Sequence, residues 1–285
     1  MLNRKQKDLI SFCLIYLSAG ISVFLLLTII VYVFIKGIGV ITPAFLMQVK
    51  SAVKGTDGIA GNILNTVYIV VITLLIAAPI GIGSAIYLNE YAKPGKFVRL
   101  IDFTTQTLAG IPSVIYGLFG MIFFGGVLGL KYSILTGAFT LTLMVLPLII
   151  GNTREALKSV PNSYRQGAVG MGATKWYMIR TILLPSALPG IVTGIILSVG
   201  RIVGESAALL FTAGSGYLLP RNAEGYLTKI LQPGGTLTIE LYLNMSKAKY
   251  DVAFGIALVL LVIVFCINLL TKYLVGRLSR SRKGE

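Results

Sequence analysis

The sequence predicts an all-α integral membrane protein, a polytopic bundle of about six transmembrane helices. Of its 285 residues, 55% are hydrophobic and 12% are charged, about half the charge density of a soluble domain. The hydrophobic residues form continuous runs of roughly 20 or more, the length that crosses a hydrocarbon core about 30 Å thick. Because these runs do not alternate with polar residues, they indicate helices and not a transmembrane β-barrel.

Six hydrophobic segments follow one another along the chain. We expect transmembrane spans at about residues 10–35, 62–87, 107–129, 133–151, 188–213 and 252–274. The segments that connect them are 36–61, 88–106, 130–132, 152–187 and 214–251. Basic residues precede the first run, as in a signal peptide, but the run is too long for a cleaved one, so we expect it to remain as a span. The segment 214–251 is compatible with short interfacial helices and equally with a disordered loop.

Lysine and arginine residues predict the orientation in the membrane. With the N-terminus in the cytoplasm, the inner segments carry about twice as many basic residues as the outer ones. Both termini are therefore expected in the cytoplasm. The formal net charge of +15 then faces anionic lipid and is no sign of nucleic-acid binding. We divide the chain into a first helix with its outer loop (1–61), a core of five spans (62–275) and a basic tail (276–285).

A basic, polar segment of residues 152–187, called the polar loop below, separates the fourth and fifth spans. The fourth span is expected to continue as helix to Val160 and to break at Pro161. A second helix is predicted from Tyr164 to Met171, with Gly172 ending it as a C-cap glycine would. A third is predicted to begin near Ala173-Thr174 and to end at Leu184-Pro185, just before the fifth span.

Small residues on the second of these helices have two interpretations. Gly167, Ala168 and Gly170 would give the helix a low profile, which a helix needs when it lies in a groove of another protein. Alternatively, the polar loop is an amphipathic connector on the lipid surface, with Trp176 and Tyr177 as interfacial anchors. The residues alone leave both open.

Arg201 and Glu205 are the only charged residues expected inside a span. Each costs about 2.5–3.5 kcal/mol at the centre of a membrane, so neither is expected to face lipid. At positions i and i+4 they would share one helix face and neutralise each other. The guanidinium fork matches a tetrahedral oxyanion, which favours a place on a substrate pathway, but a purely structural ion pair is the alternative. Weaker pathway candidates are Asn62, Asn65, Gln106 and Ser113.

The polar loop resembles the EAA motif of ABC-importer permeases. The matching residues are Gln166-Gly167-Ala168, then Gly172, Ile182 and Leu184-Pro185, each at the family's spacing. The sequence departs from the motif at Gln166, where the family usually has glutamate, and at Gly167, which replaces an alanine. Segments 78–91, 108–118 and 201–213 resemble phosphate-specific permeases, the last of them the PstA-type subunit.

This resemblance implies a type I ABC importer permease that lies in a bacterial-type inner membrane and moves inorganic phosphate. It implies as partners a second homologous permease, two cytoplasmic ATPase subunits and an extracytoplasmic phosphate-binding protein. The pathway would include Arg201 and Glu205. The ATPase-docking residues would be Gln166, Gly167, Ala168, Gly172, Ala173, Thr174, Leu184 and Pro185. Other oxyanions, such as sulfate or molybdate, are the nearest alternative, and a stand-alone ion-coupled carrier or channel is a more distant one.

Several chemical groups are missing from the sequence. No P-loop pattern G-x-x-x-x-G-K-[ST] occurs, so ATP is expected on a partner chain. There is no histidine, and Cys13 and Cys266 lie in the first and last hydrophobic runs without the spacing of metal ligands. We therefore expect no metal, no cofactor and no catalysis by this chain.

Overall fold

The computed structural model describes residues 4–51, 55–93, 95–220 and 222–281. Within these residues, five helices are long and apolar enough to cross a membrane, and the number is six if one sharply bent pair of helices is counted as a single span. The five are α1 (Arg4–Gly37), α3 (Ala60–Ile86), α6 (Ile134–Lys158), α9 (Leu184–Gly204) and α13 (Tyr250–Ser281). The predicted fold class, an all-α membrane protein of about six spans, is confirmed.

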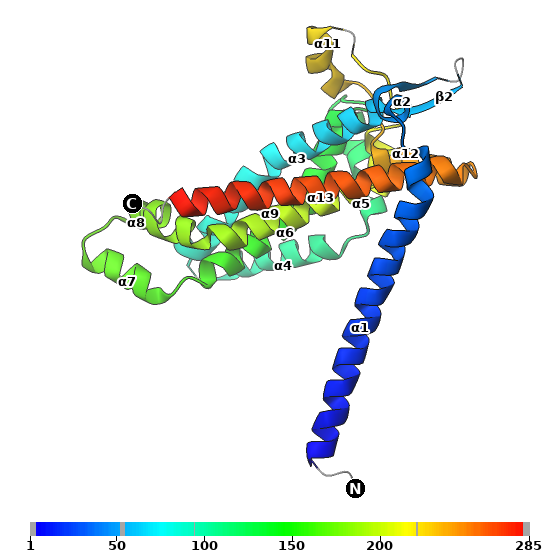
Figure 1. Cartoon of the computed structure of the whole chain (residues 1–285). Helices are drawn as coiled ribbons and strands as arrows, with labels where there is room; N and C mark the ends of the chain where they lie inside the picture. The colour runs from blue at the N-terminus through cyan, green and yellow to red at the C-terminus, as the bar shows by residue number, and fades with distance from the viewer. Residues whose placement is uncertain (1–3, 52–54, 94, 221, 282–285) are drawn as a thin grey trace.

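The centre of the molecule is a bundle in which α6 packs against both α3 and α9 (Figure 1). Its core contains Ile69, Leu141 and Ile202, one from each of these helices, and all three side chains are buried. The continuous hydrophobic runs make this arrangement favourable, because each helix satisfies its own backbone hydrogen bonds within the membrane. α13 lies along α9, so the bundle holds four of the long helices.

Helix α1 leaves the bundle and contacts it only near its own C-terminal end (Figure 1). There Tyr32 meets Phe254 of α13 edge to face, with ring centroids 5.5 Å apart. A Cβ at Gly37 would lie 2.6 Å from the Phe254 carbonyl oxygen, so only glycine allows this close approach. Most of the apolar surface of α1 therefore contacts no other described part of this chain.

The third span differs from its prediction. Instead of a helix over 107–129, α4 (Lys96–Gly110) and α5 (Ser113–Gly120), extended by the π-helical η3 (Met121–Val127), form a pair bent by 102°. Much of the expected connection 88–106 is thus helical. The bend falls at Ile111, whose extended backbone is the conformation that a following proline favours.

The fifth span was predicted as one helix over 188–213, and this was wrong. α9 ends at Gly204, Glu205 is extended, and a short helix α10 (Ala207–Thr212) follows. The predicted helix end at Leu184-Pro185 was also wrong. α8 (Lys175–Met178), the π-helical η4 (Ile179–Leu183) and α9 run on as one continuous helical segment, which is long and apolar enough to cross a membrane. A π-helical turn relaxes the hydrogen-bond ladder just before Pro185, which lacks an N–H.

At the end of the bundle opposite the polar loop lie several short elements. They are η1 (Ile38–Val40), α2 (Pro43–Met47), the antiparallel strands β1 (Val49–Ser51) and β2 (Thr56–Ile59), α11 (Ala223–Thr228), η5 (Lys229–Leu231) and α12 (Leu237–Ser246). Helices within 214–251 therefore replace the alternative of a disordered loop. Asn65 of α3 is buried, and its Nδ2 donates to the carbonyl oxygens of Gly216 (2.8 Å) and Gly235 (3.1 Å). Asn62 also donates to Gly235, at 3.0 Å, so both asparagines anchor this loop.

Replacing Lys229 by methionine is expected to stabilise the protein at neutral pH. Lys229 is buried, burial lowers its pKa, and its Nζ has one long hydrogen bond, 3.4 Å to the Pro233 carbonyl oxygen. The protonated lysine therefore lowers the free energy of unfolding. This loss of stability is complete below the folded-state pKa and vanishes as the pH rises past the unfolded-state pKa. The detergent-solubilised variant should melt about 2–4 °C higher at pH 7, corresponding to about 1 kcal/mol. The gain should shrink toward pH 10; an equal gain at both pH values would contradict this origin.

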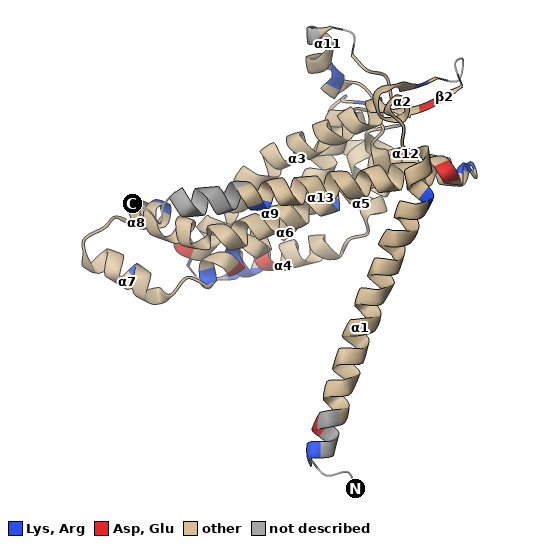
Figure 2. Cartoon of the chain, viewed as in Figure 1, with Lys and Arg blue, Asp and Glu red and all other residues tan. Residues whose placement is uncertain are grey.

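Charged residues gather at the two ends of the bundle and at the start of α1, with little charge between (Figure 2). The C-terminal end of α13 lies at the same end as the polar loop (Figure 1). Among the residues used to predict orientation, Lys54 and Arg221 lie outside the described residues. So do residues 282–285 of the expected tail, whose earlier part continues α13 to Ser281.

Candidate functional site: the polar loop and a charged groove

The polar loop folds largely as its sequence predicts. α6 continues to Lys158, and α7 (Asn162–Gly170) follows Pro161. Gly172 has φ +75°, the left-handed conformation that ends a helix at a glycine. The next helix begins after Thr174, whose Oγ1 accepts a hydrogen bond from the Tyr177 N–H at 3.3 Å. The glycine after α7 and the threonine cap before α8 therefore produce a sharp turn between the two helices.

Replacing Gly172 by alanine is expected to open this turn. The new Cβ would meet nothing within 4 Å, so the cost is that of the left-handed backbone, about 1–2 kcal/mol. Initial trypsin cleavage of the loop should therefore be roughly 5–30 times faster. Gly172→Asn should show a smaller effect, because asparagine adopts this conformation more readily. Cleavage of both variants at the original rate would show that the turn does not need a left-handed backbone conformation at position 172.

An exposed apolar surface covers α7 and α8. Tyr164, Val169, Met171, Trp176 and Tyr177 are all more than half exposed, Met171 to 88%. Of the predicted docking residues, the exposed ones are Gln166, Gly167, Gly172 and Thr174, with Ala173 half-buried beside them. Such a concentration of exposed apolar side chains fits a surface that binds a protein partner, and equally a helix pair that lies on the lipid surface.

Three predicted docking residues do not lie on this surface. Ala168 is buried in a cluster with Leu157 and Ile179 of the same chain, so its small side chain serves the loop's own packing. Leu184 and Pro185 are half-buried at the start of α9, inside the continuous membrane-crossing segment. They fix the course of the helix and are not part of the exposed loop.

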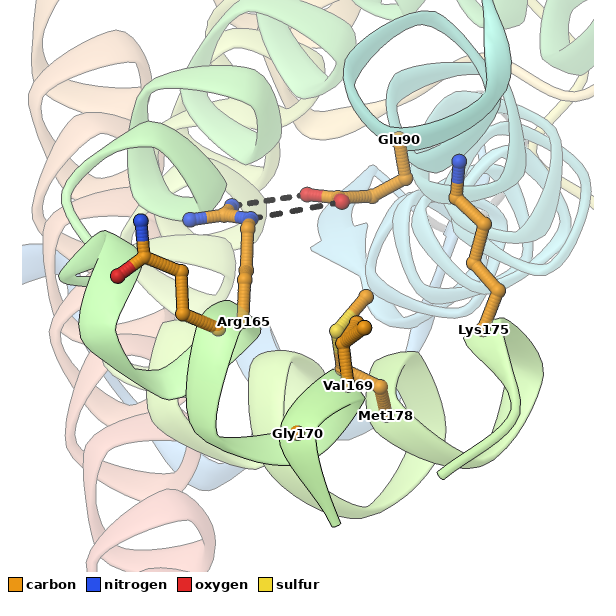
Figure 3. Close-up of a pocket in the computed structure, with 7 residues that line it drawn as sticks. Glu90, Arg165, Val169, Gly170, Lys175 and Met178 are labelled. Carbon is orange, nitrogen blue, oxygen red and sulfur yellow. Dashed lines mark hydrogen bonds and ion pairs between the residues drawn. The ribbon is translucent and has the colours of Figure 1, made fainter. Parts of the chain in front are cut away.

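Behind α7 lies a cavity of about 640 Å³, lined by Glu90, Arg165, Gln166, Val169, Gly170, Lys175 and Met178 (Figure 3). Gln166 therefore borders this cavity as well as solvent. Arg165 and Glu90 form an ion pair across it, with Nη2 2.8 Å from Oε1. Sequence reasoning missed this pair, because its members lie 75 positions apart and nothing in either segment indicates the other.

Arg201 lies in the last turn of α9 on an exposed face that also carries Thr193 and Leu197. It forms no hydrogen bond or ion pair with any described residue. The buried Tyr116 hydroxyl lies near enough for an electrostatic interaction with it. A guanidinium on a membrane-crossing helix requires a polar partner. Apart from Tyr116, that partner is water in the adjoining cavity, a bound ion or a residue outside the described part of the chain.

The predicted pairing of Arg201 with Glu205 is wrong. Because α9 ends at Gly204, the two residues do not share a helix face. The Glu205 carboxylate instead accepts a hydrogen bond from the Ala208 N–H at 3.1 Å, at the start of α10. The backbone N–H groups there compensate part of its negative charge. The charge of Arg201 is therefore not neutralised by Glu205.

A groove leads from Arg201 toward the polar-loop end of the bundle. It consists of two adjoining cavities of about 340 and 290 Å³, which share Ala109, Pro147, Gly151 and Glu155. The first also contains Arg201 and Asn152. The second contains Gln106 and Lys158, together with Arg154 paired to Asp102 through two hydrogen bonds. The remaining weak candidate, Ser113, begins α5 and lines neither cavity.

The charged residues that line this groove determine which ions it favours. Arg201, Arg154 and Lys158 outnumber Asp102 and Glu155, so the groove carries a net positive charge. Each cavity is large enough for several water molecules or a small oxyanion. Arginine offers such an anion two parallel hydrogen bonds.

Comparison with known proteins places residues 77–283 in a family described as "Binding-protein-dependent transport system inner membrane component". A Bacillus subtilis relative, "Probable ABC transporter permease protein YqgI", is 33% identical over 285 positions, covering 96% of each chain. "Phosphate transport system permease protein PstA" of Haemophilus influenzae is 30% identical over 272 positions, covering 94% of each chain. These matches extend over nearly the whole sequence.

Solved structures share the fold. A chain of a bacterial alginate ABC transporter, solved with its alginate-bound periplasmic protein, gives a TM-score of 0.67 at 17% identity and covers 97% of this chain and 99% of its own. A chain of the MetNI methionine ABC transporter in an inward-facing conformation gives 0.56 at 21% identity, covering 79% of this chain and 94% of its own.

Proposed function

Because the chain belongs to the family of binding-protein-dependent transport system inner membrane components, we propose that it is the permease through which an ABC importer moves inorganic phosphate into the cytoplasm. The membrane-spanning permease fold is the part that its relatives and its own helices establish. The choice of phosphate is supported by relatives named as phosphate permeases. It also needs a chemical reason within this chain.

Arg201 supplies that reason. It is a permanently charged, exposed side chain on a membrane-crossing helix, with no hydrogen bond or ion pair to any described residue, and it lies at the head of a positively charged groove. A phosphate ion entering between this chain and a second permease would replace lost hydration by two hydrogen bonds from one guanidinium. Because Glu205 is occupied at α10, it does not compete with the anion for Arg201.

The energy would come from ATPase subunits that grip the polar loop. Their closure on ATP would move α7, shift the helices between outward- and inward-facing states and open the groove beside Arg154 to the cytoplasm. An extracytoplasmic binding protein would deliver phosphate at the opposite end. In this proposal the polar loop and both termini lie in the cytoplasm, ATP binds to the partner subunits, and this chain has no catalytic or cofactor role.

Uptake by purified complexes in liposomes tests this function. The chain is reconstituted with its second permease, the ATPases and the binding protein, and uptake of labelled phosphate is measured with and without internal ATP. We expect uptake only with ATP and all partners, and competition by unlabelled phosphate but not by sulfate or molybdate. Uptake by the permease alone would indicate a stand-alone carrier, and equal competition by sulfate or molybdate would indicate a permease for another oxyanion.

A further inference from the structure

The guanidinium of Arg165 forms five hydrogen bonds that join three segments of the chain. From α7, it donates to both Glu90 carboxylate oxygens, at 2.8 and 3.5 Å. It also donates to the carbonyl oxygens of Leu157 (2.9 Å) and Val160 (3.0 Å) and to Asn162 Oδ1 (3.2 Å). An arginine side chain has five N–H donors, so every donor has an acceptor.

The acceptors lie where they connect α7 to the bundle. Leu157 lies in the last turn of α6 and Val160 just beyond it, a helix end where a positive charge is favoured. Glu90 lies in the π-helical segment η2 (Tyr87–Tyr91) that ends α3. Its side chain is only 5% exposed, and Oε1 accepts a further hydrogen bond from Asn89 at 2.7 Å. Figure 3 shows the Arg165 and Glu90 side chains meeting beside the cavity.

Other attachments of α7 are few. Ala168 is its only buried residue, and the rest of the helix is exposed apart from Arg165. Besides its backbone links to α6 and α8, α7 is therefore attached to the bundle by two side chains, through the packing of Ala168 on the α8–η4 segment and through Arg165. Ile82 and Ile86 of α3 also pack on the cluster that contains Ala168, but Arg165 is the residue of α7 that forms hydrogen bonds to η2, at the end of α3.

We propose that Arg165 and Glu90 form a strut that transmits movement of the ATPase-gripped α7 to the end of α3, which packs on α6 in the bundle core. This inference rests on the proposed function and adds the residues that couple ATP closure to the transport helices. The two are positioning residues and touch neither ATP nor phosphate. The π-helical turn at Glu90 gives α3 a segment able to change its hydrogen bonding, as such turns do at functional sites.

The chemistry of the pair makes it a rigid connection. Two hydrogen bonds fix the guanidinium plane against the carboxylate, and burial of Glu90 keeps water from replacing them. Lysine in place of Arg165 would keep the charge but offer three donors for five acceptors. Glutamine in place of Glu90 would keep the shape but lose the charge.

The test compares single and double variants in the complete reconstituted complex. Glu90→Gln, Arg165→Lys and Arg165→Gln are expected to assemble with ATPase subunits and to hydrolyse ATP at half the original rate or more. The phosphate transported per ATP hydrolysed should fall at least tenfold in each. The double variant Glu90→Gln/Arg165→Gln should lose no more than the worse single one, because both act through one contact. Asp57→Asn, which breaks the exposed pair with Lys249 at the opposite end, is the matched control and should keep the original ratio.

A second measurement does not depend on which substrate is carried. Hydrogen–deuterium exchange is followed with and without a non-hydrolysable ATP analogue. In the unmodified complex, exchange should change in both 162–170 and 87–91; in Glu90→Gln and Arg165→Lys it should change in 162–170 alone. The strut is refuted if 87–91 still responds in both variants, if the transport ratio is unchanged, or if both variants fail to assemble. Failure of the unmodified complex to take up phosphate would instead refute the proposed function, and the exchange result would still decide the strut.

Discussion

Replacing Arg201 by glutamine is expected to reduce phosphate uptake by the assembled complex roughly 10- to 150-fold. A hydrogen bond to a charged group contributes about 1.5–3 kcal/mol, and each 1.4 kcal/mol corresponds to a factor of ten. The variant should fold and assemble normally, because Arg201 forms no hydrogen bond or ion pair with any described residue. Removing a charge from a membrane-crossing helix also lowers its insertion cost.

A graded series separates charge from geometry at this position. Arg201→Lys keeps a positive charge without the planar fork, so we expect its uptake to lie between those of the original protein and Arg201→Gln. Lys249→Gln removes a basic residue from an exposed pair at the opposite end and serves as the control. Normal uptake by a fully assembled Arg201→Gln complex would exclude Arg201 from the phosphate pathway and return it to a structural role.

The positions of the helices could be predicted from the sequence, but the breaks within them could not. Span length and apolar composition give α1, α3, α6 and α13 nearly at their observed limits. Proline is an ambiguous signal inside a membrane. Pro79 and Pro147 lie within continuous helices, where neighbouring helices can compensate for the lost hydrogen bond. Pro112 instead accompanies a sharp bend, and only the packing of the surrounding helices distinguishes the two outcomes.

In the site, too, the features that depend on neighbouring residues could be predicted from the sequence, and those that depend on distant segments could not. Gly172 and Thr174 act through backbone geometry and capping within a few residues, so their places in the polar loop follow from sequence. The i, i+4 spacing of Arg201 and Glu205 led to a wrong prediction of their pairing, because it assumes a helix that in fact ends between them. The Arg165–Glu90 pair joins two distant segments, and a charge at each of two positions does not reveal their pairing.

Replacing Gly167 by leucine is expected to separate the permease from its ATPase subunits without unfolding it. A Cβ at Gly167 would meet nothing within 4 Å in this chain. Leucine also favours a helix by roughly 0.8–1 kcal/mol over glycine, so α7 should remain folded. Overfilling a packed interface costs about 1–3 kcal/mol, so the ATPase that co-purifies should fall by about a factor of ten.

The neighbouring residue gives this experiment its control. Ala168 is buried against this chain's own core, so Ala168→Leu should lower the melting temperature of the isolated permease, whereas Gly167→Leu should leave it unchanged or raise it. Gly167→Ala adds a single methyl group and should keep most of the ATPase. If Gly167→Leu retained the full amount of ATPase, the exposed face of α7 would not be the docking face. The polar loop would then be the amphipathic connector on the lipid surface, with Trp176 and Tyr177 as its anchors.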